Sequence, residues 1–371
     1  MPYNSIRVTG LDTLRGLAIL LVVIFHYITR SIDANASEAS QLMYQLTYYF
    51  NSGVDLFFVL SGYLITKGLL AIKKKQNFFT QFFKRRAQRI LPLYYFTLVV
   101  AFILLYAGLG ENTIWSYSDE VPWHGYFTFL QNEWMGHNNS MGSRLLAIYW
   151  SLGIEIQFYI IISVGIYFFR PRILIPLLAA LIIIAPILRM SDGTHVGMYT
   201  HFYCRMDSVF AGALIALLTT TLKSKNWIQV HKKHIETMAF LMLLLFTALT
   251  LHIVKIPTFL ISTFFMILYS LVVMVSLNLS AAKTKLTALN RLLVFLGNHS
   301  YEIYITHELV RALMFFSWGN HEPRIADTKD AILTIFSFAF TIVLAYLSRS
   351  ILTVSREHST DILKTKEFDK S

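Results

Sequence analysis

The 371-residue chain is 55% hydrophobic and only 14% charged, which is more apolar than a soluble domain of this length usually is. Its formal net charge of +11 would by itself suggest nucleic acid, but the basic residues fall in separate short loops, so we expect no nucleic-acid partner. The single cysteine, Cys204, excludes an intramolecular disulfide and a cysteine-ligated metal cluster. The composition predicts an integral membrane protein surrounded by lipid.

Long apolar runs predict about ten transmembrane helices, because a helix needs roughly 20 mostly apolar residues to cross a bilayer. In chain order the runs cover residues 11–29, 50–70, 90–109, 148–169, 172–189, 203–222, 237–254, 258–280, 292–316 and 330–352. The fifth run contains Pro176 and Pro186, and polar residues between Asn298 and Tyr304 interrupt the ninth. The prediction of a transmembrane helix is weakest for these two runs.

Basic residues are concentrated in every second loop, after the second, fourth, sixth and eighth runs. The loops between them are poor in Lys and Arg. Because short loops rich in Lys and Arg stay in the cytoplasm, both termini are predicted to be cytoplasmic. The predicted fold class is an all-α, polytopic integral membrane protein, with one transmembrane domain over residues 1–355 and a short polar cytoplasmic tail over residues 356–371.

Two ionisable residues, Arg15 and His26, share one face of the first predicted span. At about 100° per residue, their separation of eleven positions returns to within about 20° of the same direction, and it covers about 16 Å along the axis. Ionisable groups inside a span are costly and are usually retained where they line a cavity or a reaction path. The alternative is structural: Arg15 reaches the inner headgroups, and His26 makes a hydrogen bond between helices.

Several other spans carry ionisable groups near the predicted outer side of the membrane. These are Asp55, Glu155, Arg205, Asp207 and His307. Together with His26 they would form a pocket on that side.

A basic cluster precedes the third span on the predicted inner side, and it consists of Lys84, Arg85, Arg86 and Arg89. It either sets topology and binds anionic lipid, or it clamps the phosphates of a donor substrate. The sequence has no metal-binding histidine pair and no phosphate-binding glycine loop, so we expect no metal site.

Six segments follow one another along the chain: residues 11–26 (LDTLRGLAILLVVIFH), 53–66 (GVDLFFVLSGYLIT), 84–95 (KRRAQRILPLYY), 149–159 (YWSLGIEIQFY), 205–213 (RMDSVFAGA) and 296–307 (LGNHSYEIYITH). In order and spacing the chain resembles the acyltransferase 3 family of bacterial integral membrane acyltransferases. The resemblance implies a ten-helix fold that moves an acyl group, usually acetyl from cytoplasmic acetyl-CoA, to a hydroxyl of a glycan outside the membrane. Some members carry a fused extracytoplasmic hydrolase-like domain, and this chain is expected to be a freestanding form without it.

The family pattern places its essential Arg and His where Arg15 and His26 stand. Acyl transfer to a hydroxyl needs a base, and an imidazole suits that task near neutral pH. We therefore expect His26 to act as general base or as a transient acyl carrier, Arg15 to position it or balance charge, and Glu155 to orient its imidazole. The residues expected to bind the donor are Arg85, Arg86 and Arg89. Those expected in the acceptor site or the pocket are Asp55, Trp150, Ser151, Arg205, Asp207, Tyr304 and His307.

The resemblance further implies acetyl-CoA, or another acyl-CoA, as a donor substrate and no permanently bound cofactor. The implied acceptor is a glycan of the O-antigen, exopolysaccharide or capsule type, either free or lipid-linked, and the implied location is the bacterial inner membrane. Two alternatives remain at this stage. One is a transporter or flippase for a glycan or a lipid-linked intermediate, which would not consume acetyl-CoA. The other is an acyltransferase that acts on a small secondary metabolite.

Overall fold

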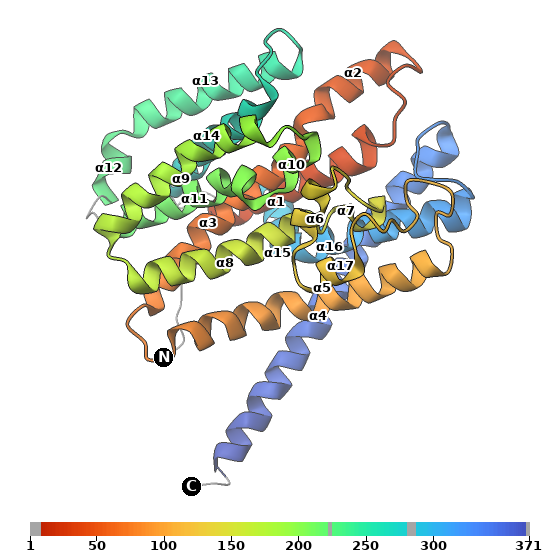
Figure 1. Cartoon of the computed structure of the whole chain (residues 1–371). Coiled ribbons are helices and arrows are strands. Elements are labelled where there is room, and N and C mark those ends of the chain that lie inside the picture. Colours follow the sequence, from red (N-terminus) through yellow and green to blue (C-terminus); the bar gives the residue numbers. More distant parts are fainter. Residues whose placement is uncertain (1–8, 222–224, 280–286, 369–371) are drawn as a thin grey trace.

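The computed structural model describes residues 9–221, 225–279 and 287–368, and from residue 351 onward it describes the backbone alone. Within these residues the chain is helical between its loops, apart from one isolated bridge that joins Ile32 to Ile325. Figure 1 shows the longer helices lying side by side as a bundle, with the end of α17 extending away from it. The predicted all-α class is confirmed.

The helices fall into two consecutive groups along the chain. The first group comprises α1 (Thr9–Ile24), the π-helical turn η1 (Phe25–Thr29), α2 (Glu38–Thr47), the 3-10 turn η2 (Tyr48–Ser52), α3 (Gly53–Ile72), α4 (Phe78–Tyr106), α5 (Trp123–Phe127), α6 (Gln131–His137), α7 (Arg144–Ala147), α8 (Trp150–Phe168) and α9 (Pro171–Asp192). The second comprises α10 (His195–Thr200), α11 (Phe202–Thr221), α12 (Lys225–Val230), α13 (Lys232–Thr250), α14 (Thr258–Leu279), α15 (Ala288–Asn298), α16 (Ser300–Met314), the π-helical turn η3 (Phe315–Gly319) and α17 (Thr328–Phe368).

Nine helical segments among the described residues are long and apolar enough to cross a membrane, and the chain is a polytopic membrane protein. They correspond to nine of the ten predicted spans. The remaining one, residues 292–316, is divided at His299 into α15 with 11 residues and α16 with 15 residues. The polar residues between Asn298 and Tyr304 interrupt the apolar run, so each piece is shorter than a full crossing requires.

The helix α4 begins at Phe78, well before the start predicted for the third span. Phe78 and Phe82 are buried, so the apolar face of the helix extends through the segment that we expected to be a loop. The basic cluster therefore lies on a helix, where each side chain has a fixed direction. This difference decides which of its arginines face the interior of the bundle.

Two glycines bring α1 and α15 into close contact. A Cβ atom on Gly16 would collide with the backbone of Leu293, and one on Gly297 would collide with the backbone of Asp12. Small residues of this kind let helices in a membrane approach each other closely. Because α1 also contacts α3 and α16, the helix that carries Arg15 is held firmly against the residues around it.

Candidate active site

The side chain of His26 forms a close pair with a buried carboxylate of α16. Its Nδ1 lies 2.6 Å from Oε1 of Glu308, whose side chain is 1% exposed, whereas that of His26 is 24% exposed. His26 lies in η1, and π-helical turns within helices occur frequently at functional sites. A carboxylate at Nδ1 fixes the tautomer and orientation of the ring and leaves Nε2 available for proton transfer.

Glu308 is held in turn by a buried guanidinium. Nη1 of Arg311 donates to both carboxylate oxygens of Glu308, at 3.0 and 3.2 Å, and its Nη2 donates to Oγ of Ser31 at 2.9 Å. Arg311 also lies over the rings of Tyr27 and Trp115, at 5.8 and 5.4 Å from their centroids. The side chains of Glu308 and Arg311 are therefore both buried, and His26 is the most exposed member of the three.

A second imidazole, that of His307, lies beside the first, with 5.0 Å between the ring centroids of His26 and His307. Nδ1 of His307 donates to the carbonyl of Tyr304 at 2.6 Å. Its buried Nε2 has no hydrogen-bond partner among the described residues. His307 was expected in the pocket, and it lies beside His26 but is fully buried and lines neither cavity.

The ligand atoms of His26, His307 and Glu308 all lie within 4.8 Å of one another, which is close enough for a metal ion to bind all three. Arg311 opposes such an ion, because its guanidinium already binds both oxygens of Glu308 and places a positive charge beside them. The arrangement therefore fits a proton-transfer pair better than a metal centre.

Two cavities lie in series along the bundle. The His26 cavity, of about 490 Å³, is lined by His26, Glu308 and Arg311, and the Arg15 cavity, of about 260 Å³, is lined by Arg15 and Glu155. Residues of the Arg15 cavity precede those of the His26 cavity along α1 and α16 and follow them along α8, so the cavities are displaced along the helix axes. Eleven helical residues, the separation of Arg15 and His26, span about 16 Å.

Both cavities share a wall that contains Val54 and Tyr304. The hydroxyl of Tyr304 donates to the carbonyl of Ile148 at 2.9 Å and lies 2.6 Å from Oγ of Ser151. The residues Ser151 and Trp150 are neighbours in α8 but line different cavities, Ser151 the Arg15 cavity and Trp150 the His26 cavity. Val54 and Tyr304 therefore lie between the two cavities.

The Arg15 cavity gathers three of the predicted basic residues, which are Arg15, Arg86 and Arg89. The guanidinium of Arg86 lies 5.9 Å from the ring centroid of Tyr159. Arg85 is exposed and does not line the cavity, because it is one position from Arg86 on α4 and so points about 100° away. Its prediction as a donor-binding residue is not supported by its position.

Glu155 was expected to orient His26, and the structure corrects this expectation. It lines the Arg15 cavity and accepts hydrogen bonds from Ser61, at 2.9 Å, and from Tyr159. Glu308 pairs with His26 instead. Glu155 therefore lies at the depth of Arg15 and not, as expected, at that of His26.

Asp55, Arg205 and Asp207 were expected in the pocket, but they do not line either cavity. They are buried in two ion pairs, Asp55 with Arg205 at 2.8 Å and Asp207 with Arg189 at 2.8 Å. Arg205 also lies over the ring of Trp150, at 5.6 Å from its centroid. These groups support the wall of the His26 cavity from behind.

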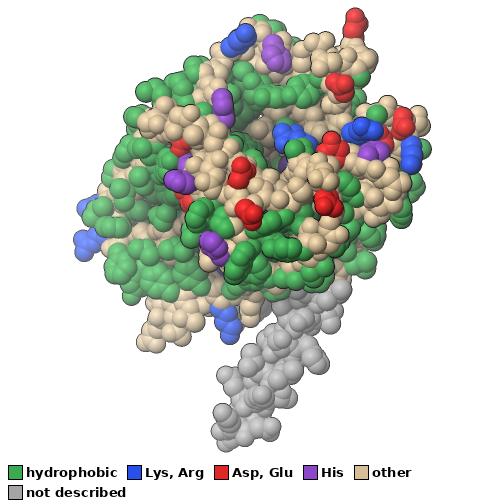
Figure 2. Space-filling view, turned by 45° about the vertical axis from the view of Figure 1, so that its right-hand side comes forward, with side chains coloured by type: hydrophobic (Ala, Val, Ile, Leu, Met, Phe, Trp, Pro, Cys, Tyr) green, Lys and Arg blue, Asp and Glu red, His purple; other side chains and the backbone are tan. Residues whose placement is uncertain are grey.

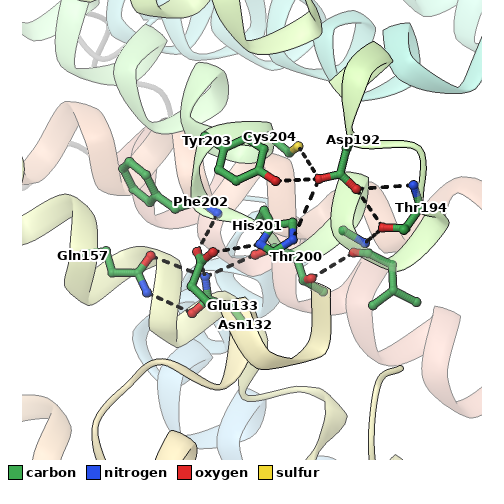
Figure 3. Close-up of polar contacts among 12 residues, drawn as sticks. Asn132, Glu133, Gln157, Asp192, Thr194, Thr200, His201, Phe202, Tyr203 and Cys204 are labelled. Atoms are coloured by element: carbon green, nitrogen blue, oxygen red, sulfur yellow. Dashed lines mark hydrogen bonds and ion pairs between the residues drawn. The ribbon is translucent and has the colours of Figure 1, made fainter. Parts of the chain in front are cut away.

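A second polar cluster joins α6, α9 and α11, and Figure 3 shows His201 between two carboxylates there. Nδ1 of His201 lies 2.7 Å from Glu133, and its Nε2 lies 3.8 Å from Asp192. Glu133 also accepts from the backbone N–H of Phe202, and Asp192 accepts from the hydroxyl of Tyr203. This cluster was not predicted from the sequence.

Comparison with known proteins gives a consistent result. A sequence model described as an acyltransferase domain, of the acyltransferase 3 family, matches residues 8–349. The O-acetyltransferase OatA of Staphylococcus aureus strain NCTC 8325 is 26% identical over 231 residues, which cover 58% of this chain and 35% of OatA. YrhL of Bacillus subtilis strain 168, a candidate peptidoglycan O-acetyltransferase, is 30% identical over 258 residues, which cover 64% of this chain and 38% of YrhL.

A candidate O-acetyltransferase of Staphylococcus aureus strain COL is 26% identical over 383 residues, covering 93% of this chain and 57% of its own length. The chain thus spans between about a third and three fifths of the length of these relatives. No solved structure matches it.

Proposed function

Because the chain belongs to the acyltransferase 3 family, we propose that it is a membrane O-acyltransferase that moves an acetyl group from acetyl-CoA to a hydroxyl of a glycan. One observation carries this proposal: a cavity lined by arginines and a cavity with a carboxylate-bound histidine share a single wall. The first suits an anionic donor, and the second suits a hydroxyl that must lose a proton. A transporter would not consume acetyl-CoA, so release of CoA by the purified protein distinguishes the two functions.

The Arg15 cavity is the proposed entrance for the donor, from the cytoplasm in the orientation predicted by the basic loops. Guanidinium groups match the oxygens of phosphates, which acyl-CoA carries. Arg86 and Arg89 would bind these phosphates, and Arg15 would hold the thioester end nearer the wall. The narrow thioester arm would then pass between Val54 and Tyr304 toward His26.

His26 is the proposed general base. Its Nε2 takes the proton of the acceptor hydroxyl while the hydroxyl oxygen attacks the thioester carbonyl carbon. Glu308 stabilises the imidazolium, and Arg311 keeps Glu308 ionised and oriented. The C–O bond forms, the C–S bond breaks, and the proton on His26 passes to the departing sulfur.

The proposed acceptor is a glycan of the bacterial cell surface, and the proposed location is the bacterial cytoplasmic membrane. The names of the relatives support a polysaccharide-type acceptor, since one of them is described for peptidoglycan. Trp150 and Tyr199 in the wall of the His26 cavity offer aromatic faces for sugar rings.

The test compares His26→Ala with a matched control, His124→Ala, whose side chain is exposed on α5. Full-length protein would be expressed in a strain that lacks its own copy, and two-dimensional NMR of the surface polysaccharide would detect O-acetyl groups. Loss of a general base typically lowers the rate about 10²–10⁴-fold, so His26→Ala should remove the signal at normal membrane abundance, while His124→Ala should retain it. Normal O-acetylation by His26→Ala would contradict the proposed mechanism.

A further inference from the structure

The His26 cavity has more positive than negative charge on its walls. Its basic lining residues are Arg30, Arg144 and Arg311, and its one carboxylate is Glu308. Glu308 is already occupied, because it binds Arg311 on one side and His26 on the other. Its charge therefore neutralises Arg311 and leaves the other two arginines without compensation from the lining.

Arg30 and Arg144 make no ion pair with a carboxylate among the described residues, although both belong to the cavity wall. The guanidinium of Arg30 lies over the ring of Phe25, at 5.9 Å from its centroid. Arg144 is repelled by the charges of Arg30 and Arg311 and attracted by those of Glu308 and Glu322. Two like charges held near each other favour an anion between them.

Hydrogen bonds hold the backbone at both arginines, whose side chains are exposed in Arg30 and partly exposed in Arg144. The N–H of Arg30 donates to the carbonyl of Phe25 at 3.0 Å, and that of Arg144 donates to Ile114 at 3.0 Å. Beside Arg144, Ser143 donates to the carbonyl of Trp115 at 2.7 Å. Arg30 follows His26 by four positions, a spacing that places two side chains on the same helix face.

The cavity is large enough for a sugar and opens at the surface. Its volume is about 490 Å³, and Tyr44, Tyr48 and Trp150 add aromatic faces to its walls. Figure 2 shows a hollow on the face that is turned forward, with basic, acidic and histidine side chains near its opening. The cavity therefore combines aromatic surfaces, a base and two arginines that make no ion pair with a carboxylate among the described residues.

We propose that the acceptor is an acidic sugar, whose carboxylate or phosphate binds Arg30 and Arg144 while its hydroxyl lies at Nε2 of His26. This inference rests on the proposed function, which it narrows from glycans in general to anionic glycans. The two arginines would bind a carboxylate and a phosphate in the same way, because both groups accept paired hydrogen bonds from guanidinium groups. The two cations thus select the sugar and set its orientation toward the base.

The first test measures binding and requires no acyl transfer. Purified full-length protein in an uncharged detergent is titrated with an oligomer of mannuronic acid and with the same oligomer after its carboxylates are reduced to alcohols. Glucose 1-phosphate and methyl glucoside form a second pair. We expect at least one acidic probe to bind at least tenfold more tightly than its neutral partner, with a preference that weakens as salt rises.

Arg30→Gln and Arg144→Gln should each reduce this preference about tenfold. The matched control is Arg324→Gln, because Arg324 is exposed beside Ile325, which bridges to Ile32, and it does not line the cavity. Arg144→Lys should recover part of the preference, since it keeps the charge without the planar fork. The proposal fails if acidic and neutral probes bind alike, if neither acidic probe binds at millimolar concentration, or if both glutamine variants retain the preference.

A third arm distinguishes a glycan from a lipid headgroup. The protein is reconstituted in phosphatidylcholine vesicles with or without phosphatidylglycerol, and binding of the acidic probes is measured again. Unchanged binding supports a glycan, whereas loss of the arginine-dependent binding in phosphatidylglycerol would assign the site to a headgroup and overturn the proposal. Because these binding measurements involve no acyl transfer, a failure of this inference is separable from a failure of the proposed acyl transfer.

Discussion

Two of the histidine–carboxylate clusters in the described part of the chain share a contact but differ in what surrounds it. His26 lies 2.6 Å from Glu308, and His201 lies 2.7 Å from Glu133. On its other side His26 borders a cavity, whereas Nε2 of His201 faces Asp192 at 3.8 Å.

This comparison shows that the imidazole–carboxylate pair does not by itself indicate catalysis. What matters is whether the second ring nitrogen can reach a substrate. His201 is enclosed by partners from three helices, so it fixes the segment that carries Tyr199 into the cavity wall. We therefore expect the chemistry at the His26 cluster and structural support from the His201 cluster.

The largest effect on the rate is expected from replacing Glu308, which contacts His26, and a much smaller one from replacing Glu133, which contacts His201. Glu308→Gln removes the charge that stabilises the imidazolium of His26, so acyl transfer should fall roughly 10²–10⁴-fold. Glu133→Gln should change the rate less than tenfold. Initial rates of CoA release by purified protein, normalised to folded protein, measure both.

Because Glu308 also compensates buried Arg311, its replacement is expected to lower stability as well. Thermal unfolding of each variant therefore accompanies the rate. Equal losses of rate in the two glutamine variants, at equal stability, would remove the distinction between the clusters.

The next effect concerns donor binding on α4. Arg86→Gln or Arg89→Gln should raise the Michaelis constant for acetyl-CoA about ten- to a hundredfold, because a hydrogen bond to a charged group contributes about 1.5–3 kcal/mol. The control is Arg85→Gln on the same helix, where the side chain is exposed. An equal rise in Arg85→Gln would indicate a general effect of charge.

A smaller effect is expected at the supporting cluster. His201→Ala removes a partner from Glu133 and Asp192, so the free energy of unfolding should fall by about 1–3 kcal/mol. Activity at low temperature should stay within a few-fold of that of the unchanged protein. Thermal unfolding in detergent and the rate of acyl transfer at low temperature test this prediction. A loss of rate without a loss of stability would indicate that His201 takes part in catalysis.

The smallest effect is expected from metal removal. His26, His307 and Glu308 are close enough to hold an ion, but Arg311 occupies the carboxylate that the ion would need. Dialysis against a chelator should therefore leave the rate of acyl transfer unchanged. Loss of activity that returns with zinc would make this group a metal centre.

The sequence predicted the helices and the stripe of Arg15 and His26 because both follow from local periodicity. It did not predict Glu308 and Arg311, although two ionisable residues three positions apart in a predicted span were a visible signal. Glu155 was assigned to the wrong partner because approximate span boundaries identify neither the exact depth of a side chain nor the neighbouring helix, and it lines the Arg15 cavity.

The arginines of α4 are a second case in which the sequence alone did not show which side chains face the site. While the segment was expected to be a loop, nothing distinguished Arg85 from Arg86 and Arg89. Because α4 begins at Phe78, successive side chains there are rotated by about 100°, and Arg85 points away from the direction of Arg86.

The wall of Val54 and Tyr304 has an electrical consequence. If water fills the cavities on both of its sides, most of the membrane voltage falls across these two side chains. Moving one elementary charge through 100 mV involves about 2.3 kcal/mol, so a neutral thioester would cross this wall without that work while a thiolate would not. Returning the proton of His26 to the sulfur before the arm withdraws would make the departing thiol neutral, and the catalytic cycle would then be insensitive to the membrane potential.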